Sequence, residues 1–180
     1  SGEFRIVDLV IPANGTQEMA RIVSYPAGEQ ARNFTLQQTL YNYDCLLRST
    51  ETSLNGYPAL STPDADEVLQ ATLQHVVATY DPIEGRRIYV NGNLVSQVDP
   101  VPGGTLIDWQ DTFAFVIGNE VSGDGPWEGT VRLAAVHRRA LTQEQVTQTY
   151  EVGVGETVFL LFDVSDTIFA APHSASILVS

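Results

Sequence analysis

The stretch that decides the fold reads LQHVVATYDPIEGRRIYVNGNLVSQV over residues 73–98. Two runs rich in β-branched and aromatic residues, His75–Tyr80 and Arg87–Val90, predict two strands. After the second run, Asn91-Gly92 predicts a two-residue type I′ turn, because both central residues of that turn need a positive φ. The segment therefore predicts two strands and a tight hairpin into a third.

The second half of this signal reads FVIGNEVSGDGPWEGTVRLAAVHRRALTQEQVTQTYEVG over residues 115–153. Phe113–Gly118 and Val131–Val136 predict two further strands. Thr142 and Gln145 have the spacing of a capping box, in which each side chain bonds to the backbone of the other residue. One short helix is therefore expected after the last strand.

Gly, Pro, Asn and Asp punctuate the rest of the chain at short intervals. Short strands between such turns predict an all-β fold, an antiparallel β-sandwich with one short helix near residues 142–152. A length of 180 residues fits one domain with a full hydrophobic core. We place the sandwich at residues 1–155. Residues 156–180 contain a nearly all-apolar run, Val158–Val164, and either complete the sandwich or begin a neighbouring module.

The charge balance limits the partners. The chain has a net charge of −13, and its nine basic residues are all arginine. This field would repel a phosphate backbone, so we expect no nucleic-acid partner. No apolar run approaches the ~20 residues of a membrane helix, so no membrane insertion is expected. Cys45 is the only cysteine, which rules out an intrachain disulfide and predicts a small buried apolar residue.

Five motifs in this order carry a resemblance to a known family. They are HVVATYD at residues 75–81, IYVNGNLV at 88–95, IGN at 117–119, WEG at 127–129 and RRALTQEQV at 138–146. Together they resemble the laminin G-like module of the concanavalin A-like lectin/glucanase superfamily, in its bacterial form. The resemblance implies a β-sandwich jelly roll, a fold that carries lectins, adhesion modules, hydrolases and spacers alike.

For function, the resemblance implies a non-catalytic binding or spacer module of a larger exported bacterial protein. Its partners would be a glycan, a protein ligand or the neighbouring domains of the parent protein. Its location would be extracellular or periplasmic. The alternatives are a glycoside hydrolase or lyase of the same fold, and a purely structural domain that buttresses a neighbour.

The residues themselves do not favour an enzyme. Hydrolases of this superfamily that cleave β-glucans carry E-x-D-x-E on one strand, which sets three carboxylates on one face. That string is absent, and the nearest acidic cluster, Asp64–Glu67, follows a proline and predicts a solvated turn. No G-x-S-x-G elbow is present. His75, His137 and His173 are expected to be structural, so we predict no catalytic residue.

Calcium is the one cofactor that the resemblance suggests, and no cofactor is favoured. The ion takes six to eight oxygen ligands, and Asn119, Glu120 and Asp124 offer such oxygens in a glycine-containing loop. The family often has an aspartate shortly after the W-x-G motif, and Arg132 stands at that position here. Because arginine supplies no oxygen ligand, we expect no tight calcium site.

Sugar binding would need an aromatic ring beside a few well-placed polar groups. Trp109, which lies between acids and amides, and the pair Tyr41 and Tyr43 are the ligand-binding candidates. Trp127 stands where the family has a buried aromatic residue, so we expect it in the core. No residue pattern identifies the sugar.

Overall fold

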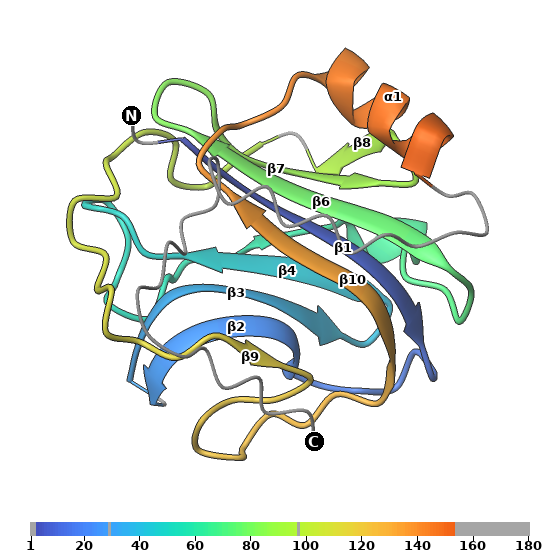
Figure 1. Cartoon of the computed structure of the whole chain (residues 1–180), viewed down its shortest axis with the longest axis horizontal. Coiled ribbons are helices and arrows are strands. Elements are labelled where there is room, and N and C mark those ends of the chain that lie inside the picture. The colour runs from blue at the N-terminus through green and yellow to red at the C-terminus, as the bar shows by residue number, and fades with distance from the viewer. Residues whose placement is uncertain (1–2, 29, 97, 154–180) are drawn as a thin grey trace.

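The computed structural model describes residues 3–28, 30–96 and 98–153. Two antiparallel five-stranded sheets pack face to face (Figure 1), with the strand orders β10-β1-β6-β7-β8 and β5-β4-β3-β2-β9. The strands are β1 (Phe4–Pro12), β2 (Ala20–Gly28), β3 (Ala31–Thr39), β4 (Asn42–Leu47), β5 (Leu60–Ser61), β6 (Gln74–Asp81), β7 (Gly85–Val90), β8 (Asn93–Ser96), β9 (Val116–Ile117) and β10 (Gly129–His137). One short 3-10 turn, Asp64–Asp66, and one helix, α1 (Gln143–Gly153), complete the described elements. The predicted β-sandwich jelly roll with one short helix is confirmed.

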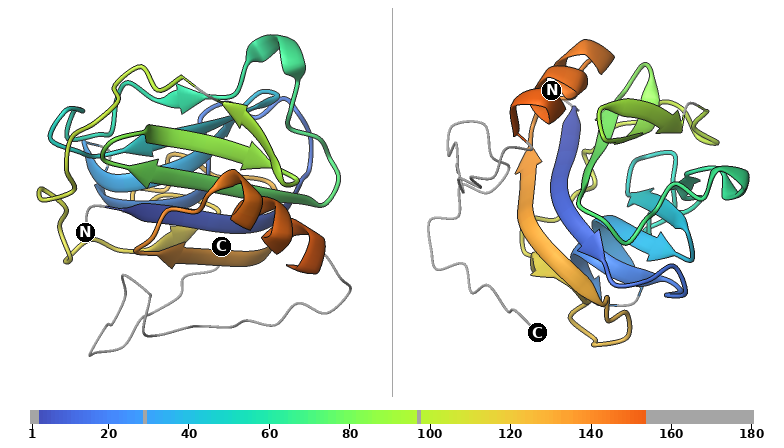
Figure 2. Two further views of the ribbon diagram at one scale, coloured as in Figure 1. Left: turned by 90° about the horizontal axis from the view of Figure 1, so that it is seen from above. Right: turned by 90° about the vertical axis from the view of Figure 1, so that its right-hand side faces the viewer.

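The helix lies against the outer side of one sheet (Figure 2), and we call this sheet the helix-covered sheet and the other the loop-covered sheet. No helix among the described residues is long and apolar enough to cross a membrane. The segment 156–180, which we expect either to complete the sandwich or to begin a new module, lies outside the described residues.

The hairpin and the helix form as their sequences predict. Asn91 and Gly92 have φ values of 51° and 80°, as a type I′ turn requires. At the helix start, Thr142 N–H donates to Gln145 Oε1 at 3.0 Å and Gln145 N–H donates to Thr142 Oγ1 at 3.3 Å. This reciprocal pair is the predicted capping box.

One predicted strand is mostly wrong. Instead of a strand over residues 113–118, only β9 pairs with a neighbour, through Val23 and Ser24 of β2. The preceding aromatic residues are loop anchors, because Phe113 packs against Tyr25 with ring centroids 6.2 Å apart and Phe115 packs against Phe34. These residues are apolar because they pack into the core from a loop, and not because they belong to a strand.

Alternating side chains from both sheets form the core. Phe4, Ile6 and Val10 of β1 point inward, as do Phe34 and Leu36 of β3. On the outer side of the helix-covered sheet, a second apolar cluster joins the sheet to the helix. Its buried members are Val7, Val77, Tyr89, Leu141 and Val146.

Candidate functional site

The W-x-G motif anchors one end of the sandwich. Trp127 is buried, and its indole Nε1 donates to Gln38 Oε1 at 2.8 Å. A Cβ at Gly129 would lie 2.3 Å from the Trp127 ring and 2.6 Å from the Ile11 carbonyl oxygen. The glycine is therefore needed so that the tryptophan can lie over the start of β10, next to the end of β1. Trp127 is in the core, as predicted.

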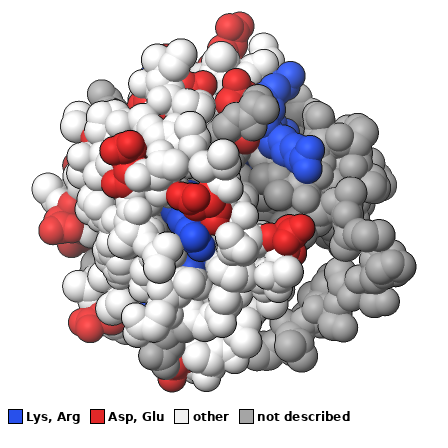
Figure 3. All heavy atoms as spheres, turned by 90° about the vertical axis from the view of Figure 1, so that its left-hand side faces the viewer, with Lys and Arg blue, Asp and Glu red and all other residues white. Residues whose placement is uncertain are grey.

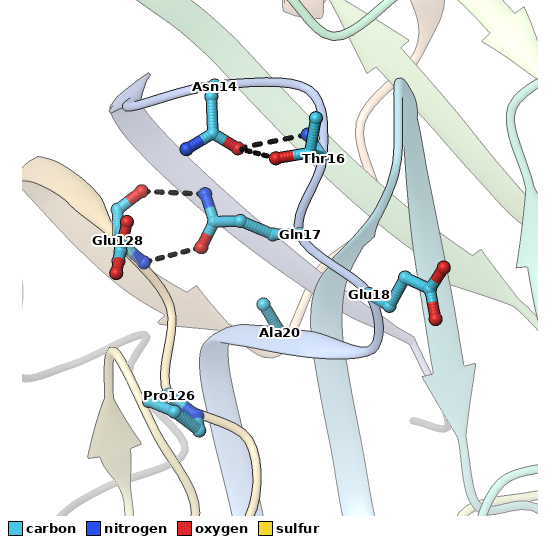
Figure 4. A pocket seen from close by; sticks show the side chains of 7 residues that line it. All are labelled: Asn14, Thr16, Gln17, Glu18, Ala20, Pro126 and Glu128. Carbon is cyan, nitrogen blue, oxygen red and sulfur yellow. Dashed lines mark hydrogen bonds between the residues drawn. The ribbon is translucent and has the colours of Figure 1, made fainter.

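Gln17 ties the β1–β2 loop to this anchor. Its Nε2 donates to the Glu128 carbonyl at 2.8 Å, and the Glu128 N–H donates to Gln17 Oε1 at 2.6 Å (Figure 4). The same Nε2 donates to Gln38 Oε1 at 3.1 Å, which links it to the tryptophan network. One amide side chain thus pairs with a backbone in the way a neighbouring strand would.

These contacts shape a shallow pocket of about 290 Å³ that we call the rim pocket. Its lining residues are Asn14, Thr16, Gln17, Glu18, Ala20, Pro126 and Glu128 (Figure 4). Oδ1 of Asn14 accepts from the N–H and the hydroxyl of Thr16, at 2.9 and 2.8 Å. Within the described residues, the Nδ2 of Asn14 and the carboxylates of Glu18 and Glu128 carry no hydrogen bond or ion pair. These groups are available to a ligand.

Exposed apolar side chains stand beside the rim pocket. Met19 is 49% exposed, and Leu40 and Tyr41 are each 44% exposed. The Leu40 N–H donates to the Gln17 carbonyl at 2.6 Å, and a Cβ at Gly15 would lie 2.1 Å from the Tyr41 ring. The Tyr41 ring therefore lies against the loop that lines the pocket.

The backbone is strained at the same place. Met19 has a φ of 50° and Leu40 a φ of 53°, values that residues with a Cβ rarely adopt. Such conformations cost about 1–3 kcal/mol each and cluster at functional sites. The chain holds these two apolar side chains in costly positions at the edge of a polar pocket.

The two tyrosine candidates, Tyr41 and Tyr43, differ in their exposure to solvent. Tyr43 is fully buried, and its hydroxyl donates to Gln74 Oε1 at 2.7 Å, so it offers no surface to a ligand. Tyr41 belongs to the β3–β4 turn, outside the alternation of either strand, and stays exposed beside the rim pocket. Of the two tyrosines, only Tyr41 remains a ligand-binding candidate.

Trp109 is a half-buried loop anchor. Its ring packs edge-on against Phe4, with centroids 5.0 Å apart, and lies 5.8 Å from the Phe34 ring. Its Nε1 donates to the Arg48 carbonyl at 2.7 Å. The indole ring thus packs against core residues, and its single hydrogen-bond donor is already bonded to the protein.

The calcium candidates have other partners. Asn119 Oδ1 accepts from the Glu120 N–H at 2.8 Å and from the Gly125 N–H at 3.3 Å. Asp124 is exposed, whereas the Glu120 carboxylate is buried against two arginines. Among the described residues, no three His, Cys, Asp or Glu side chains converge as they would to hold a metal ion. The expectation that the loop holds no tight calcium site stays a prediction.

The Glu120 carboxylate belongs to a polar network on the outer face of the loop-covered sheet. Nε of Arg21 and Nη1 of Arg32 lie 2.9 and 2.7 Å from the same Glu120 oxygen. A register shift in the β2–β3 pairing turns Arg32 onto this face. Arg21 also donates to Gln37, whose Nε2 donates to Asp44 at 3.0 Å. Burial lowers the pKa of Arg32, and the charge of Glu120 opposes that change.

Other titratable groups are buried away from the rim pocket. His75 lies beneath the helix beside the Tyr150 ring, and burial lowers its pKa to about 4. Asp8 is fully buried in the core with no hydrogen-bond partner among the described residues, and burial raises its pKa well above the usual range. Cys45 is buried, as predicted, and burial raises the pKa of its thiol to about 12. His173 lies outside the described residues.

The buried Arg86 of β7 forms an ion pair with a loop aspartate and a hydrogen bond to the other sheet. Nε and Nη2 of Arg86 donate to the two oxygens of Asp99, at 2.9 and 2.7 Å, and Nη1 donates to the Cys45 carbonyl at 3.0 Å. Burial alone would raise the pKa of Asp99, but the hydrogen bonds from Arg86 and the Val101 N–H lower it overall. This pair is structural, because each nitrogen of the buried guanidinium donates to a protein atom.

The chain belongs to the concanavalin A-like lectin/glucanases superfamily, because the laminin G-like family model of that superfamily matches residues 10–147. No curated protein sequence matches the chain. The family assignment agrees with the resemblance carried by the sequence motifs.

Solved structures with this fold include carbohydrate-binding proteins. The CBM40 domain of the Ruminococcus gnavus IT-sialidase, determined with α2,3-sialyllactose bound, is 18% identical over 83% of each chain, with a TM-score of 0.64. The heptameric SAP-like pentraxin of Limulus polyphemus is 19% identical over 83% of this chain and 70% of its own, with a TM-score of 0.58. Domain 4 of the extracellular arabinanase AbnA of Geobacillus stearothermophilus, with arabinotriose bound, is 17% identical over 82% and 66%, with a TM-score of 0.50. At these identities the likeness is one of fold.

Proposed function

We propose that this domain is a non-catalytic carbohydrate-binding module whose glycan contacts the rim pocket. The observation that carries the proposal is the exposed Tyr41 ring beside a pocket with free polar groups. Sugars offer an apolar C–H face to an aromatic ring and hydroxyls to amides and carboxylates, and a pocket of this composition matches both. The glycan complexes of two proteins with the same fold support the proposal.

The pocket favours binding over hydrolysis. Glu18 and Glu128 are both exposed to water. A glycosidase pairs one carboxylate in a water-poor setting, which keeps it protonated as the general acid, with a second that stays ionised. Neither lining carboxylate has such a setting. We therefore expect a bound glycan to be released unchanged, and we expect the module to act within an exported protein.

A glycan array followed by calorimetric titration of the best ligand tests the proposal. We expect Tyr41→Ala to weaken binding at least about fivefold, taking the value of about 1–3 kcal/mol that an aromatic side chain supplies to a stacked base as the scale for a stacked sugar. Tyr57→Ala is the matched control, since Tyr57 is 40% exposed but lies in a different loop. If Tyr41→Ala binds as wild type does, or if no glycan on the array binds, the proposal is wrong. Appearance of new reducing ends would show an enzyme instead.

A further inference from the structure

The charge of the rim-pocket lining indicates which glycans it takes, and this inference rests on the function proposed above. Of the seven lining residues, two are carboxylates and none is arginine or histidine. The carboxylates of Glu18 and Glu128 can only accept hydrogen bonds, so they suit the hydroxyl groups of a sugar. The Nδ2 of Asn14 is the donor side-chain group that the lining leaves free.

The nearest arginine in the fold cannot neutralise the pocket. Arg21 follows Ala20 directly, but its side chain points to the outer face of the loop-covered sheet and is buried. Its Nε donates to Glu120 at 2.9 Å, and its Nη1 donates to the Met19 carbonyl at 2.6 Å and to Gln37. Its charge is balanced within that network.

Of the other arginines, the exposed Arg132 lies on β10 four residues after Glu128, roughly 14 Å along the strand, whereas Arg5 lies at the far end of β1 and Arg139 beyond the far end of β10. Arg5 and Arg139 line a separate shallow cavity of about 480 Å³ beside the helix. At about 3.4 Å per residue, the seven residues from Arg5 to Pro12 span roughly 24 Å, which is about three Debye lengths at physiological salt. Salt therefore screens Arg5 and Arg139 from the rim pocket, and it screens Arg132, which is not a lining residue, in part. On the face drawn in Figure 3, acidic side chains are spread widely while basic ones occupy isolated spots, in keeping with the net charge of −13.

We propose that the rim pocket selects uncharged glycans and excludes acidic ones, namely those with sialic acid, uronic acid or sulfate groups. An acidic group in the pocket would meet Glu18 and Glu128 with no counter-charge from the lining. Two unit charges roughly 7 Å apart in water repel enough to weaken binding about threefold, so two carboxylates predict a loss of about tenfold. This specificity is opposite to that of the sialyllactose-binding CBM40 domain that shares the fold.

Matched glycan pairs that differ by one acidic group test the proposal, for example lactose against sialyllactose and an oligogalactoside against an oligogalacturonide. We expect the neutral member of a binding pair to bind about tenfold more tightly at 0.05 M NaCl. The preference should shrink at ~1 M NaCl, where the Debye length falls to about 3 Å.

Charge-neutral variants assign the effect to the pocket. Glu18→Gln and Glu128→Gln should each raise binding of the acidic member about threefold and so reduce the preference. Glu144→Gln, which removes the same charge from the exposed side of the helix, should leave the preference unchanged. Equal or tighter binding of acidic glycans, or an equal response of all three variants, overturns the proposal. That outcome differs from a failure of the glycan-binding function, in which neither member of any pair binds.

Discussion

The outer faces of the two sheets are both covered, but by opposite chemistry. On the helix-covered sheet, Leu141 and Val146 bury an apolar stripe of strand residues. On the loop-covered sheet, Arg21 and Arg32 meet Glu120 from a loop that lies 99 residues from Arg21 in the sequence. Removing a few apolar atoms from the helix-covered face should lower stability only slightly. Removing one charge from the buried ionic network of the loop-covered face should lower stability strongly, because the opposite charge is then buried without a partner. The two faces should therefore respond differently to substitution, pH and metal ions.

The largest expected effect comes from Glu120→Ala on the loop-covered face. The change leaves Arg21 and Arg32 buried together without their shared carboxylate. Removing one partner of a buried ion pair typically costs about 3–5 kcal/mol of unfolding free energy. Chemical denaturation measures the loss, and Glu144→Ala, at an exposed acid, should change stability by less than about 1 kcal/mol. If Glu120→Ala is as stable as Glu144→Ala, the ion pairs of Glu120 with Arg21 and Arg32 do not stabilise the protein.

On the helix-covered face, acid should act through His75. Burial lowers the folded-state pKa to about 4, so the folded protein binds fewer protons than the unfolded chain between pH 6.5 and 4. Above pH 6.5 His75 is neutral in both states and costs no stability. As the pH drops from 6.5 to 4, the unfolding free energy falls by about 3 kcal/mol, because only the unfolded chain gains the proton. Asp8 acts in the other direction, because its raised pKa favours the folded state at low pH.

Comparing wild type with His75→Phe isolates the histidine, since Asp8 is present in both proteins. Denaturation curves from pH 7.5 to pH 4 should show that the variant loses less stability on acidification. Parallel pH profiles for the two proteins would mean that His75 is not held neutral beneath the helix.

The hairpin under the helix gives a smaller effect. Gly92 has a φ of 80°, and a Cβ there would lie 3.1 Å from the Tyr150 ring. Gly92→Val should therefore cost about 1–2 kcal/mol, through backbone strain and displacement of the helix. Thermal melting of the variant provides the measurement. An unchanged melting temperature would refute both the turn and the contact with the helix.

Calcium should have the smallest effect. Glu120 is held by arginines, and Arg132 stands at the family's acidic position, so millimolar calcium should stabilise the protein by less than about 0.5 kcal/mol. Melting with calcium and then with a chelator tests this expectation. A rise of several degrees that Asp124→Ala abolishes would instead place the ion in the loop after β9.

Sequence reasoning succeeded where structure is encoded by neighbours along the chain. The Asn91-Gly92 turn and the capping box at Thr142 are both local, and both are confirmed. The Arg21–Glu120 pair and the Gln17–Glu128 clamp join residues about a hundred positions apart, and no spacing rule connects them.

The rim pocket was only partly foreseeable. Tyr41 and Tyr43 are two residues apart, so strand alternation would place them on one face. The β3–β4 turn, with Leu40 at positive φ, separates them and leaves one exposed and one in the core. The pair of hydrogen bonds between the Gln17 side chain and the Glu128 backbone could not be predicted from the sequence, because a single glutamine in a loop matches no known motif.

Mapping the bound glycan onto the protein by NMR tests the central claim most directly. With the best ligand from the array, we expect the largest amide shift changes at Gly15, Gln17 and Glu128, and little change at Arg5 and along the helix. Gly15→Ala should displace the Tyr41 ring and weaken the same titration, because a Cβ there would lie 2.1 Å from that ring. Shift changes that gather around Trp109 or the Arg5–Arg139 cavity, with the rim pocket unaffected, would contradict the account.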